Sequence, residues 1–372
     1  DLFLARPTQS LSAVWKRAFN TDPSTRLGLL FYFEQAIWGM STLARYTPTH
    51  YSQVNQYLSG VLYVASQIVE VHPRYILDGK LDRLTKVMSR APAKPQQAVV
   101  STSDCSALGL PASSVDYVFT DPPFGENIYY ADLNYLVESW HGVFTRPDGE
   151  AIIDRARGKQ LLEYQHLMRR CFEEYFRVLK PGRWMTVVFS NSSNGVWRAI
   201  QEGLGTAGFV VADVRTLDKQ QSSFKQVTSS AVKQDLVISA YKPTEVLSGK
   251  FALGEATEDG AWAFVAEHLR NVPRWVPSAD RGEVVAERTS QMLHDRMIAF
   301  HVQRGLGVPI SGPAFDEGLR QRFSERDGMF FLSHQVADYD RRRAGVAEDR
   351  PDLLGQAGTT RGRLGDRPRD VA

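Results

Sequence analysis

Between residues 98 and 242, strand-like runs alternate with helix-like segments, and this alternation constrains the fold more strongly than any other feature of the chain. Strands are predicted at 98–104, 113–121 and 183–192, and helices at 130–144, 158–179 and 195–209. Such alternation is typical of a mostly parallel sheet, because each helix returns the chain to the start of the next strand. Two final strands, at 210–217 and 234–242, have no helix between them. We therefore predict a doubly wound α/β sheet that ends in an antiparallel hairpin at one edge.

The segments on either side of this sheet are predicted to be helical. Residues 1–92 form a helical N-terminal region, with helices over 1–20, 26–46 and 73–90 and a short strand at 60–65. The core occupies residues 93–243. Residues 244–345 form a helical C-terminal region, with helices near 259–271 and 280–303, which is either a packing subdomain or a substrate-recognition module. Residues 346–372 are rich in Arg, Asp, Gly and Pro and are predicted to be a disordered tail.

The composition is that of a globular protein and excludes few partners. The formal net charge is +2, which neither requires nor opposes binding to nucleic acid. The two cysteines, Cys105 and Cys171, are far apart in the sequence and build neither a disulfide framework nor a zinc site, so a cytoplasmic location is the default. The eight histidines show no metal-ligand spacing, and no metal is expected. No apolar run is long enough to span a membrane. Because the chain begins with Asp1, we expect it to be a fragment of a longer protein.

The stretch VDYVFTDPPFGENIYY, residues 115–130, places an aspartate and two prolines directly after an apolar strand. Pro122 and Pro123 fix two φ angles and lack N–H donors, so the turn is stiff and its carbonyls can accept hydrogen bonds. The Asp121 carboxylate and the Pro122 carbonyl can then converge on one NH2 group, while Phe124 offers a flat face for stacking. A plain turn is the alternative. The strand before the motif and the aromatic residue within it favour a pocket for an aromatic ring that bears an amine.

These residues resemble a known signature. Asp121-Pro122-Pro123-Phe124 is similar to the (Asp/Asn/Ser)-Pro-Pro-(Tyr/Phe/Trp) motif of S-adenosylmethionine-dependent amino-methyltransferases. The wider stretches DYVFTDPPFGENIYYADLNYLVESW and RVLKPGRWMTVVFS resemble the adenine-specific DNA methylases of bacteria and archaea, including those of restriction–modification systems. The resemblance covers about residues 97–243. It implies the class I methyltransferase fold, a Rossmann-like sheet with a reversed last strand, which agrees with the predicted hairpin.

The resemblance also implies residue roles. The target base is flipped out of the helix, and Asp121 and the Pro122 carbonyl accept the amine protons, so that the nitrogen lone pair points at the methyl group of the cofactor. The resemblance implies two further roles, at the mouth of the base pocket and at the cofactor. Asn127, Tyr129 and Tyr130 line the pocket mouth, although either tyrosine is equally well explained as a core residue. Asp104, Ser190 and Asn191 contact S-adenosylmethionine. The alternative for Asp104 is a helix cap.

The sequence departs from the family pattern at the cofactor. The family holds the methionine part of S-adenosylmethionine with a glycine-rich loop after the first strand, and the ribose with an acid after the second. Neither is found, because the glycines before residue 97 are isolated. Either these strands lie upstream of Asp1 or on a second polypeptide, or the chain binds without methylating. The intact motif favours the first explanation, with a sheet that is incomplete at its first strands.

Three basic segments are weaker candidates for contact with the nucleic-acid backbone. The loop 218–233 carries Lys219, Lys225 and Lys233; the segment 145–159 carries Arg146, Arg155, Arg157 and Lys159; and Arg341–Arg343 form a cluster that touches DNA or caps a helix.

The leading functional prediction is methyl transfer to an exocyclic amine of DNA, adenine N6 first and cytosine N4 second. The first alternative is an RNA guanine-N2 methyltransferase, for which no RNA-binding appendage is visible. The second is a non-catalytic subunit that recognises DNA for a modification or defence complex.

Overall fold

The computed structural model describes residues 2–49, 51–54, 62, 64–90, 98–126, 128–190, 194–218, 234–251, 256–276 and 284–348. The chain divides into two compact units, Asp1–Ser248 and Gly249–Ala372, which are described separately. No helix in the described ranges is long and apolar enough to cross a membrane.

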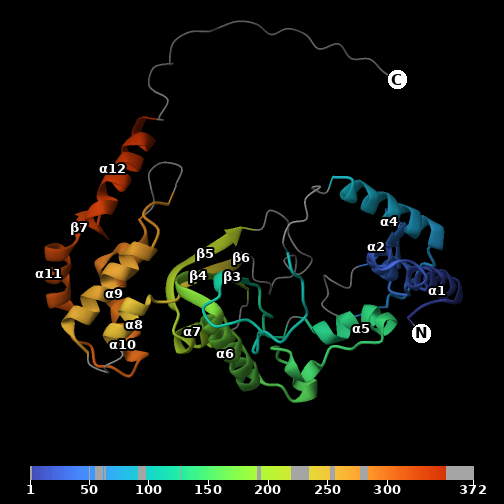
Figure 1. Cartoon of the computed structure of the whole chain (residues 1–372), viewed down its shortest axis with the longest axis horizontal. Helices are drawn as coiled ribbons and strands as arrows, with labels where there is room; N and C mark the ends of the chain where they lie inside the picture. The colour runs from blue at the N-terminus through green and yellow to red at the C-terminus, as the bar shows by residue number, and fades with distance from the viewer. Residues whose placement is uncertain are drawn as a thin grey trace, which may run out of the picture. The chain divides into compact units, whose positions relative to one another are not determined.

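The N-terminal part of the first unit is a helical layer (Figure 1). It contains α1 (Ala5–Phe19), α2 (Pro23–Ile37) and α4 (Pro73–Met88), which share one apolar core with α5 (Tyr130–His141). The Asp22 carboxylate caps α2 by accepting from the main-chain N–H groups of Ser24 and Thr25, each at 3.1 Å. The two short strands β1 (Arg45–Thr47) and β2 (Tyr51–Gln53) form a hairpin.

The helix expected over 26–46 is shorter in the structure. It ends at Ile37 and tightens into a 3-10 turn, η1 (Trp38–Met40). A Cβ atom on Gly39 would lie 3.1 Å from Ile76 Cδ1, so the glycine allows α4 to approach this turn closely. The strand expected at 60–65 falls mainly outside the described residues, and positions 62, 64 and 65 have no strand geometry.

The core of the first unit is a four-stranded mixed sheet with the order β3-β4-β6-β5. Its strands are β3 (Val115–Thr120), β4 (Leu179–Phe189), β5 (Val210–Asp218) and β6 (Gln234–Tyr241). The pair β3 and β4 is parallel, whereas β6 is antiparallel to both of its neighbours. The last strand therefore lies reversed between β4 and β5, which confirms the predicted α/β fold with its closing antiparallel pair.

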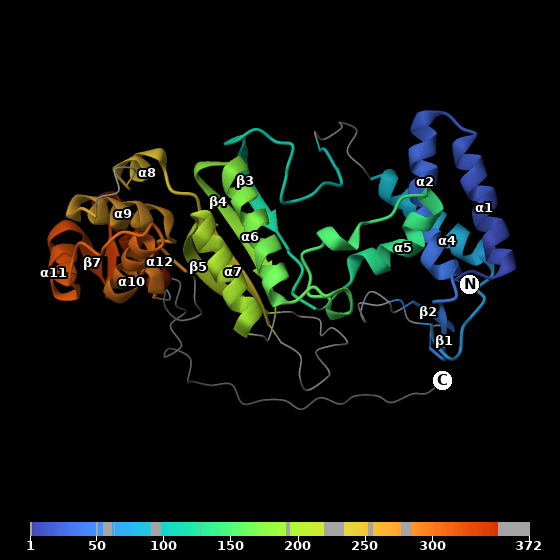
Figure 2. The same ribbon diagram turned by 90° about the horizontal axis from the view of Figure 1, so that it is seen from below.

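Two helices cover one face of this sheet, α6 (Leu161–Val178) and α7 (Asn194–Ala207), and Figure 2 shows them side by side across the strands. Tyr164, Met168 and Phe172 recur every four residues on α6 and are all buried against the sheet. A Cβ atom on Gly203 of α7 would lie 2.9 Å from Phe172 Cδ2, so this glycine sets the close contact between the two helices.

The strand predicted at 98–104 is absent, and this prediction is wrong. Residues 98–104 have no regular structure, and Val99 and Val100 are 95% and 96% exposed. A β-branched run forms a strand only where a neighbouring strand accepts its hydrogen bonds. In the described part of the chain no strand lies beside this run, and β3 is an edge strand of the sheet.

The second unit is mostly helical. It contains the end of α8 (Glu245–Phe251), then α9 (Glu258–Asn271), η5 (Ala286–Arg288), α10 (Ser290–Val302), α11 (Gly312–Arg322) and α12 (Ser333–Glu348). The hairpin of β7 (Ser324–Arg326) and β8 (Met329–Phe331) joins the last two helices. Of the helix predicted near 280–303, residues 280–283 lie outside the described ranges. The remainder contains η5 and α10, because the capping Thr289 between them begins a new helix.

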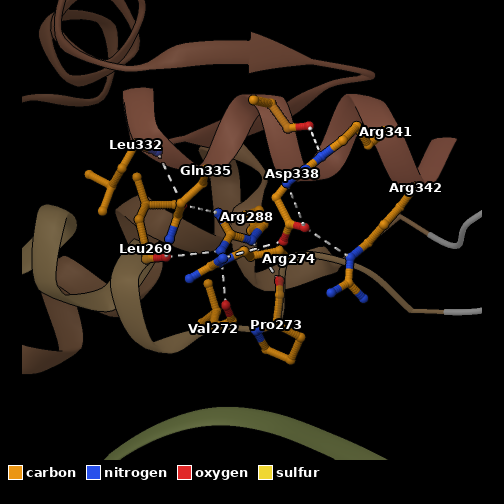
Figure 3. Close-up of polar contacts among 11 residues, drawn as sticks. Leu269, Val272, Pro273, Arg274, Arg288, Leu332, Gln335, Asp338, Arg341 and Arg342 are labelled. Carbon is orange, nitrogen blue, oxygen red and sulfur yellow. Dashed lines mark hydrogen bonds and ion pairs between the residues drawn. The ribbon is translucent and has the colours of Figure 1, made fainter. Parts of the chain in front are cut away.

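Arg288 holds this unit together (Figure 3). Its guanidinium is fully buried and lies over the Phe331 ring. It donates to the main-chain oxygens of Leu269 in α9, of Val272 and Pro273 directly after α9, and of Phe330 in β8, at 2.6–2.9 Å. Gln335 accepts a further bond at 3.2 Å. Burial lowers the pKa of Arg288 to about 10, so the side chain keeps its charge at neutral pH.

Replacing Arg288 with Met is therefore expected to destabilise the second unit by about 3 kcal/mol, because the main-chain oxygens lose their donor while staying buried. Hydrogen–deuterium exchange of the α9 and α12 amides in the full chain measures this loss. Arg341→Met is the matched control, since the Arg341 side chain is 80% exposed, and its effect should stay within about 0.5 kcal/mol. Equal exchange in both variants would contradict the role given to Arg288.

Candidate functional site

The motif loop follows β3 directly and presents Asp121 to solvent. Asp121 is exposed, Pro122 is buried, and Pro123 and Phe124 are half-buried. Because β3 and β4 are parallel and pair Thr120 with Val187, Asp121 and Ser190 lie at the same carboxyl end of the sheet. This is the edge at which open α/β sheets bind ligands. The carboxylate expected to hold an amine is thus outside the protein interior.

Three contacts fix the motif loop onto the core. The Tyr164 hydroxyl donates to the Pro123 carbonyl at 2.9 Å. The Ile153 N–H donates to the carbonyl of Gly125, whose φ of 74° suits a glycine. The Phe124 ring packs edge-to-face on Phe189, with 5.3 Å between centroids. Within the described ranges no hydrogen bond reaches the Pro122 carbonyl, so the anchored carbonyl is the one next to it.

The tyrosines that follow the motif begin α5. Tyr130 is 39% exposed, and burial together with the negative charges of Asp121 and Glu150 raises its pKa. Tyr130 thus shares one electrostatic environment with the motif carboxylate. Tyr129 precedes α5 and is half-buried. Its pKa is raised by burial first and by Glu126 next. Asn127 lies outside the described residues.

Glu150 and Tyr164 belong to this site, and sequence reasoning missed both. Glu150 Oε1 accepts from the Ala131 N–H at 2.5 Å, which ties the segment 145–159 to the first turn of α5. Among the described residues its Oε2 is buried without a hydrogen-bond partner. Burial raises the pKa of Glu150. Neither residue belongs to a local motif, so no sequence signal marks them.

The basic residues of the segment 145–159 are mostly engaged within the protein. The buried Lys159 amine donates to the main-chain oxygens of Pro147, Asp148 and Glu150. Arg157 bridges Asp132 at 2.9 Å and Asp154 at 2.8 Å, and Arg155 lies 3.4 Å from Glu126. The expected contact of Lys159 with the nucleic-acid backbone is therefore wrong, because its amine is buried and donates to main-chain oxygens of its own loop.

The arginine cluster of α12 is also partly compensated. Arg341 and Arg342 lie 3.9 Å and 3.3 Å from Asp338, which Arg274 approaches as well (Figure 3). Arg343 lies 3.0 Å from Asp327. Three arginines share the one carboxylate of Asp338, so the cluster is only partly compensated, and its contact with a phosphate backbone stays a prediction.

Of the other predicted site residues, the structure describes Asp104 and Ser190. Asp104 is exposed, and its carboxylate accepts from the Ser106 N–H at 2.7 Å; this hydrogen bond lowers its pKa. It caps a turn, whereas the alternative for this residue expected a helix after it. Ser190 is half-buried at the end of β4. Three candidates lie outside the described residues: Asn191, Lys225 and Lys233.

Cys171 is a poor candidate for a nucleophile. Both cysteines are free thiols. Burial raises the pKa of Cys171 to about 12, so its thiolate is scarce at neutral pH. In the described ranges no group of acidic, histidine and cysteine side chains is arranged to hold a metal.

Among the residues that the structure describes, β3 is an edge strand, and one face of the sheet beside the motif is exposed. Tyr117 and Phe119 project from the face opposite α6 and α7 and are 52% and 63% exposed. The Tyr117 hydroxyl bonds Thr186 Oγ1 at 2.6 Å across this face. Parallel strands are usually buried on both faces. The carboxyl-end crevice therefore has one wall, at β4, in the described part of the chain.

Comparison with known proteins gives weak likenesses. No family model matches the chain, and no curated protein matches it. A SAM-dependent methyltransferase from Methanosarcina mazei has 16% identity and a TM-score of 0.23, over 44% of this chain and 77% of that one. A candidate DNA modification methylase from Thermus thermophilus, complexed with S-adenosyl-L-methionine, has 15% identity and a TM-score of 0.23, over 59% of this chain and 91% of that one. Likeness at this level carries no argument about activity.

Glu150 makes stability depend on pH. Its raised pKa means that the folded state binds a proton more tightly than the unfolded state, so its contribution is present below the unfolded pKa and is lost as pH rises through the folded pKa. Glu150→Gln keeps an oxygen for the Ala131 N–H and removes the buried charge. We expect its melting temperature to exceed that of the unaltered chain at about pH 7.5, with a smaller difference at about pH 4. Differential scanning fluorimetry at both values checks this, and a variant less stable at the higher pH would refute it.

Proposed function

We propose that this chain is the base-binding part of an S-adenosylmethionine-dependent DNA methyltransferase that acts on an exocyclic amine, with adenine N6 as the acceptor. The observation that carries the proposal is the exposed Asp121 carboxylate, held by an anchored Pro-Pro turn at the carboxyl end of a parallel strand. An amine that is to be alkylated needs two acceptors at fixed positions, because they orient the nitrogen lone pair.

In this mechanism the chain supplies positioning and electrostatics. The Asp121 carboxylate and the Pro122 carbonyl each accept one hydrogen of the base amine, which leaves the lone pair directed out of the base plane. The negative carboxylate stabilises the positive charge that grows on the nitrogen, and it is the nearest acceptor for the proton released. The charge of Asp121 helps to raise the pKa of Tyr130, so in this proposal the Tyr130 side chain lies beside the bound base. S-adenosylmethionine supplies the methyl group.

The target base has to leave the duplex to reach Asp121, because its amine is buried in the stack. Phe124 offers part of its ring to the base, while Phe189 holds the other part in the core. A ring supported in this way stays in place when the base enters, which limits the entropy lost on binding.

The described residues do not by themselves fit the whole cofactor. Asp104 and Ser190 are the candidate contacts within them, and the described part of the chain has no glycine-rich loop between a strand and a helix. The proposal therefore includes a second polypeptide that carries this loop. Among the described residues β3 is an edge strand, which supports this part, because a parallel strand added there would end beside Asp121 and a helix that accompanies it would cover the exposed Tyr117 and Phe119.

Asp121→Ala is expected to lower methyl transfer at least about 100-fold, since it removes a preorganised charge from the reacting nitrogen. The assay uses the protein isolated from its native host with its bound polypeptides, labelled S-adenosylmethionine and three substrates: duplex DNA, single-stranded DNA and RNA. Nucleoside analysis identifies the methylated base.

The exposed Asp82, on α4, provides the control Asp82→Ala, which should retain activity. Label in N6-methyladenine of DNA supports the proposal. Label in RNA guanine, or full activity in Asp121→Ala, refutes it.

The chain alone is expected to bind S-adenosylmethionine with a dissociation constant weaker than roughly 100 µM, since most of the cofactor contacts are absent from it. Isothermal titration calorimetry measures this directly. Micromolar affinity would show that the second polypeptide is unnecessary for binding.

A further inference from the structure

We infer that α5 and the segment after it form a second nucleobase-binding site, which holds an unpaired base next to the target base. The site is a cavity of about 510 Å³, lined by Ala131, Asp132, Tyr135, Glu138, Phe144 and Arg157. A volume in this range suits a small organic ligand such as a nucleoside. The inference rests on the proposed function, because it assigns a DNA base to the cavity.

Two aromatic rings form the platform of this site. Tyr135 and Phe144 lie with centroids 5.7 Å apart and planes 28° apart, and they are 50% and 60% exposed. Gly142 ends α5 in the left-handed conformation, with φ 67°, which turns the chain back so that Phe144 reaches Tyr135. Exposed aromatic faces that need no base pairing are the usual platforms for single-stranded nucleic acid.

The platform is held in place before any ligand arrives. The Glu138 carboxylate accepts from the N–H of Thr145, at 2.7 Å, and from its hydroxyl. This fixes the residue next to Phe144 onto the same helix that carries Tyr135. Binding therefore costs little ordering of the loop, which favours a stacked ligand.

The charges of the cavity select a base rather than a phosphate. Asp132 and Glu138 line it, and Arg157 is already bonded to Asp132 and Asp154. A phosphate group would meet two carboxylates and one engaged cation. Carboxylate oxygens keep lone pairs for further donors, so an exocyclic amine fits. The ligand class is thus adenine, cytosine or guanine, whereas thymine lacks such an amine.

The position of the cavity on α5 indicates that its base lies near the target base in the same strand. Ala131, Tyr135 and Glu138 lie on one face of α5, and the charge of Asp121 acts on Tyr130 at the start of this helix. Tyr135 is five positions after Tyr130, about 7.5 Å further along the axis and about 140° around it. A strand whose target base sits at Asp121, and whose backbone passes around the start of α5, therefore brings a neighbouring base to Tyr135.

Fluorescence anisotropy with short labelled homopolymers of deoxyadenosine, deoxycytidine and deoxythymidine tests this site on the full chain, without any methyl donor. We expect deoxyadenosine and deoxycytidine oligomers to bind at least about tenfold more tightly than deoxythymidine oligomers. The double variant Tyr135→Ala and Phe144→Ala should bind the deoxyadenosine and deoxycytidine oligomers about tenfold or more weakly, because it loses the stacking free energy of one base.

Two controls separate stacking from general effects. The single variant Tyr135→Phe keeps the ring and should bind the oligomers as tightly as the unaltered chain. Tyr75→Ala removes a 73% exposed ring on α4 and should leave the affinity unchanged. Equal binding of all three oligomers, an unaffected double variant, or no binding of any oligomer would overturn the inference.

The outcome is distinguishable from that of the methylation assay. Selective oligomer binding that is lost in the double variant, with no methyl transfer by the native protein, would leave this site standing and refute the proposed function. Adenine methylation by the native protein, with unaltered oligomer binding in the double variant, would support the proposed function and refute the second base site.

Discussion

The hydrogen bond from the Tyr164 hydroxyl to the Pro123 carbonyl links the candidate chemistry to the fold. Tyr164 is fully buried in the core that α6 and α7 form against the sheet, so its hydroxyl position is set by packing. The Pro-Pro turn has few rotatable bonds of its own. This contact at its centre, together with those of Phe124 and Gly125, fixes where the Asp121 carboxylate emerges, and a positioning mechanism depends on such fixed placement.

A second layer of polar contacts supports α5, the helix on which both proposed base sites depend. Glu150 bonds the first turn of this helix, Arg157 bonds Asp132, and Lys159 closes the segment behind them by binding its carbonyls. Arg157 and Lys159 are engaged in holding this segment in place, whereas Arg146 is exposed. At the proposed second base site, Asp132 and Glu138 supply acceptors that suit base amines.

The open edge of β3 is the other constraint on function. Tyr117 and Phe119 expose aromatic surface on a strand whose carboxyl end carries the motif. An unpaired strand edge is a template for pairing. Among the described residues no strand lies on the free side of β3, which is why a second polypeptide enters the proposed function.

The sequence by itself determined the α/β pattern, the closing antiparallel pair and the stiff exposed turn at Asp121, because periodicity and proline chemistry act over a few neighbouring residues. It misjudged residues 98–104, since a strand needs a partner that no local pattern reveals. Tertiary structure alone decided that Lys159 is buried, that Arg341–Arg343 are paired, and that Tyr164, Glu150 and the ring pair of Tyr135 and Phe144 belong near the motif. These contacts join residues up to several tens of positions apart, and only the folded chain brings such groups within hydrogen-bond distance.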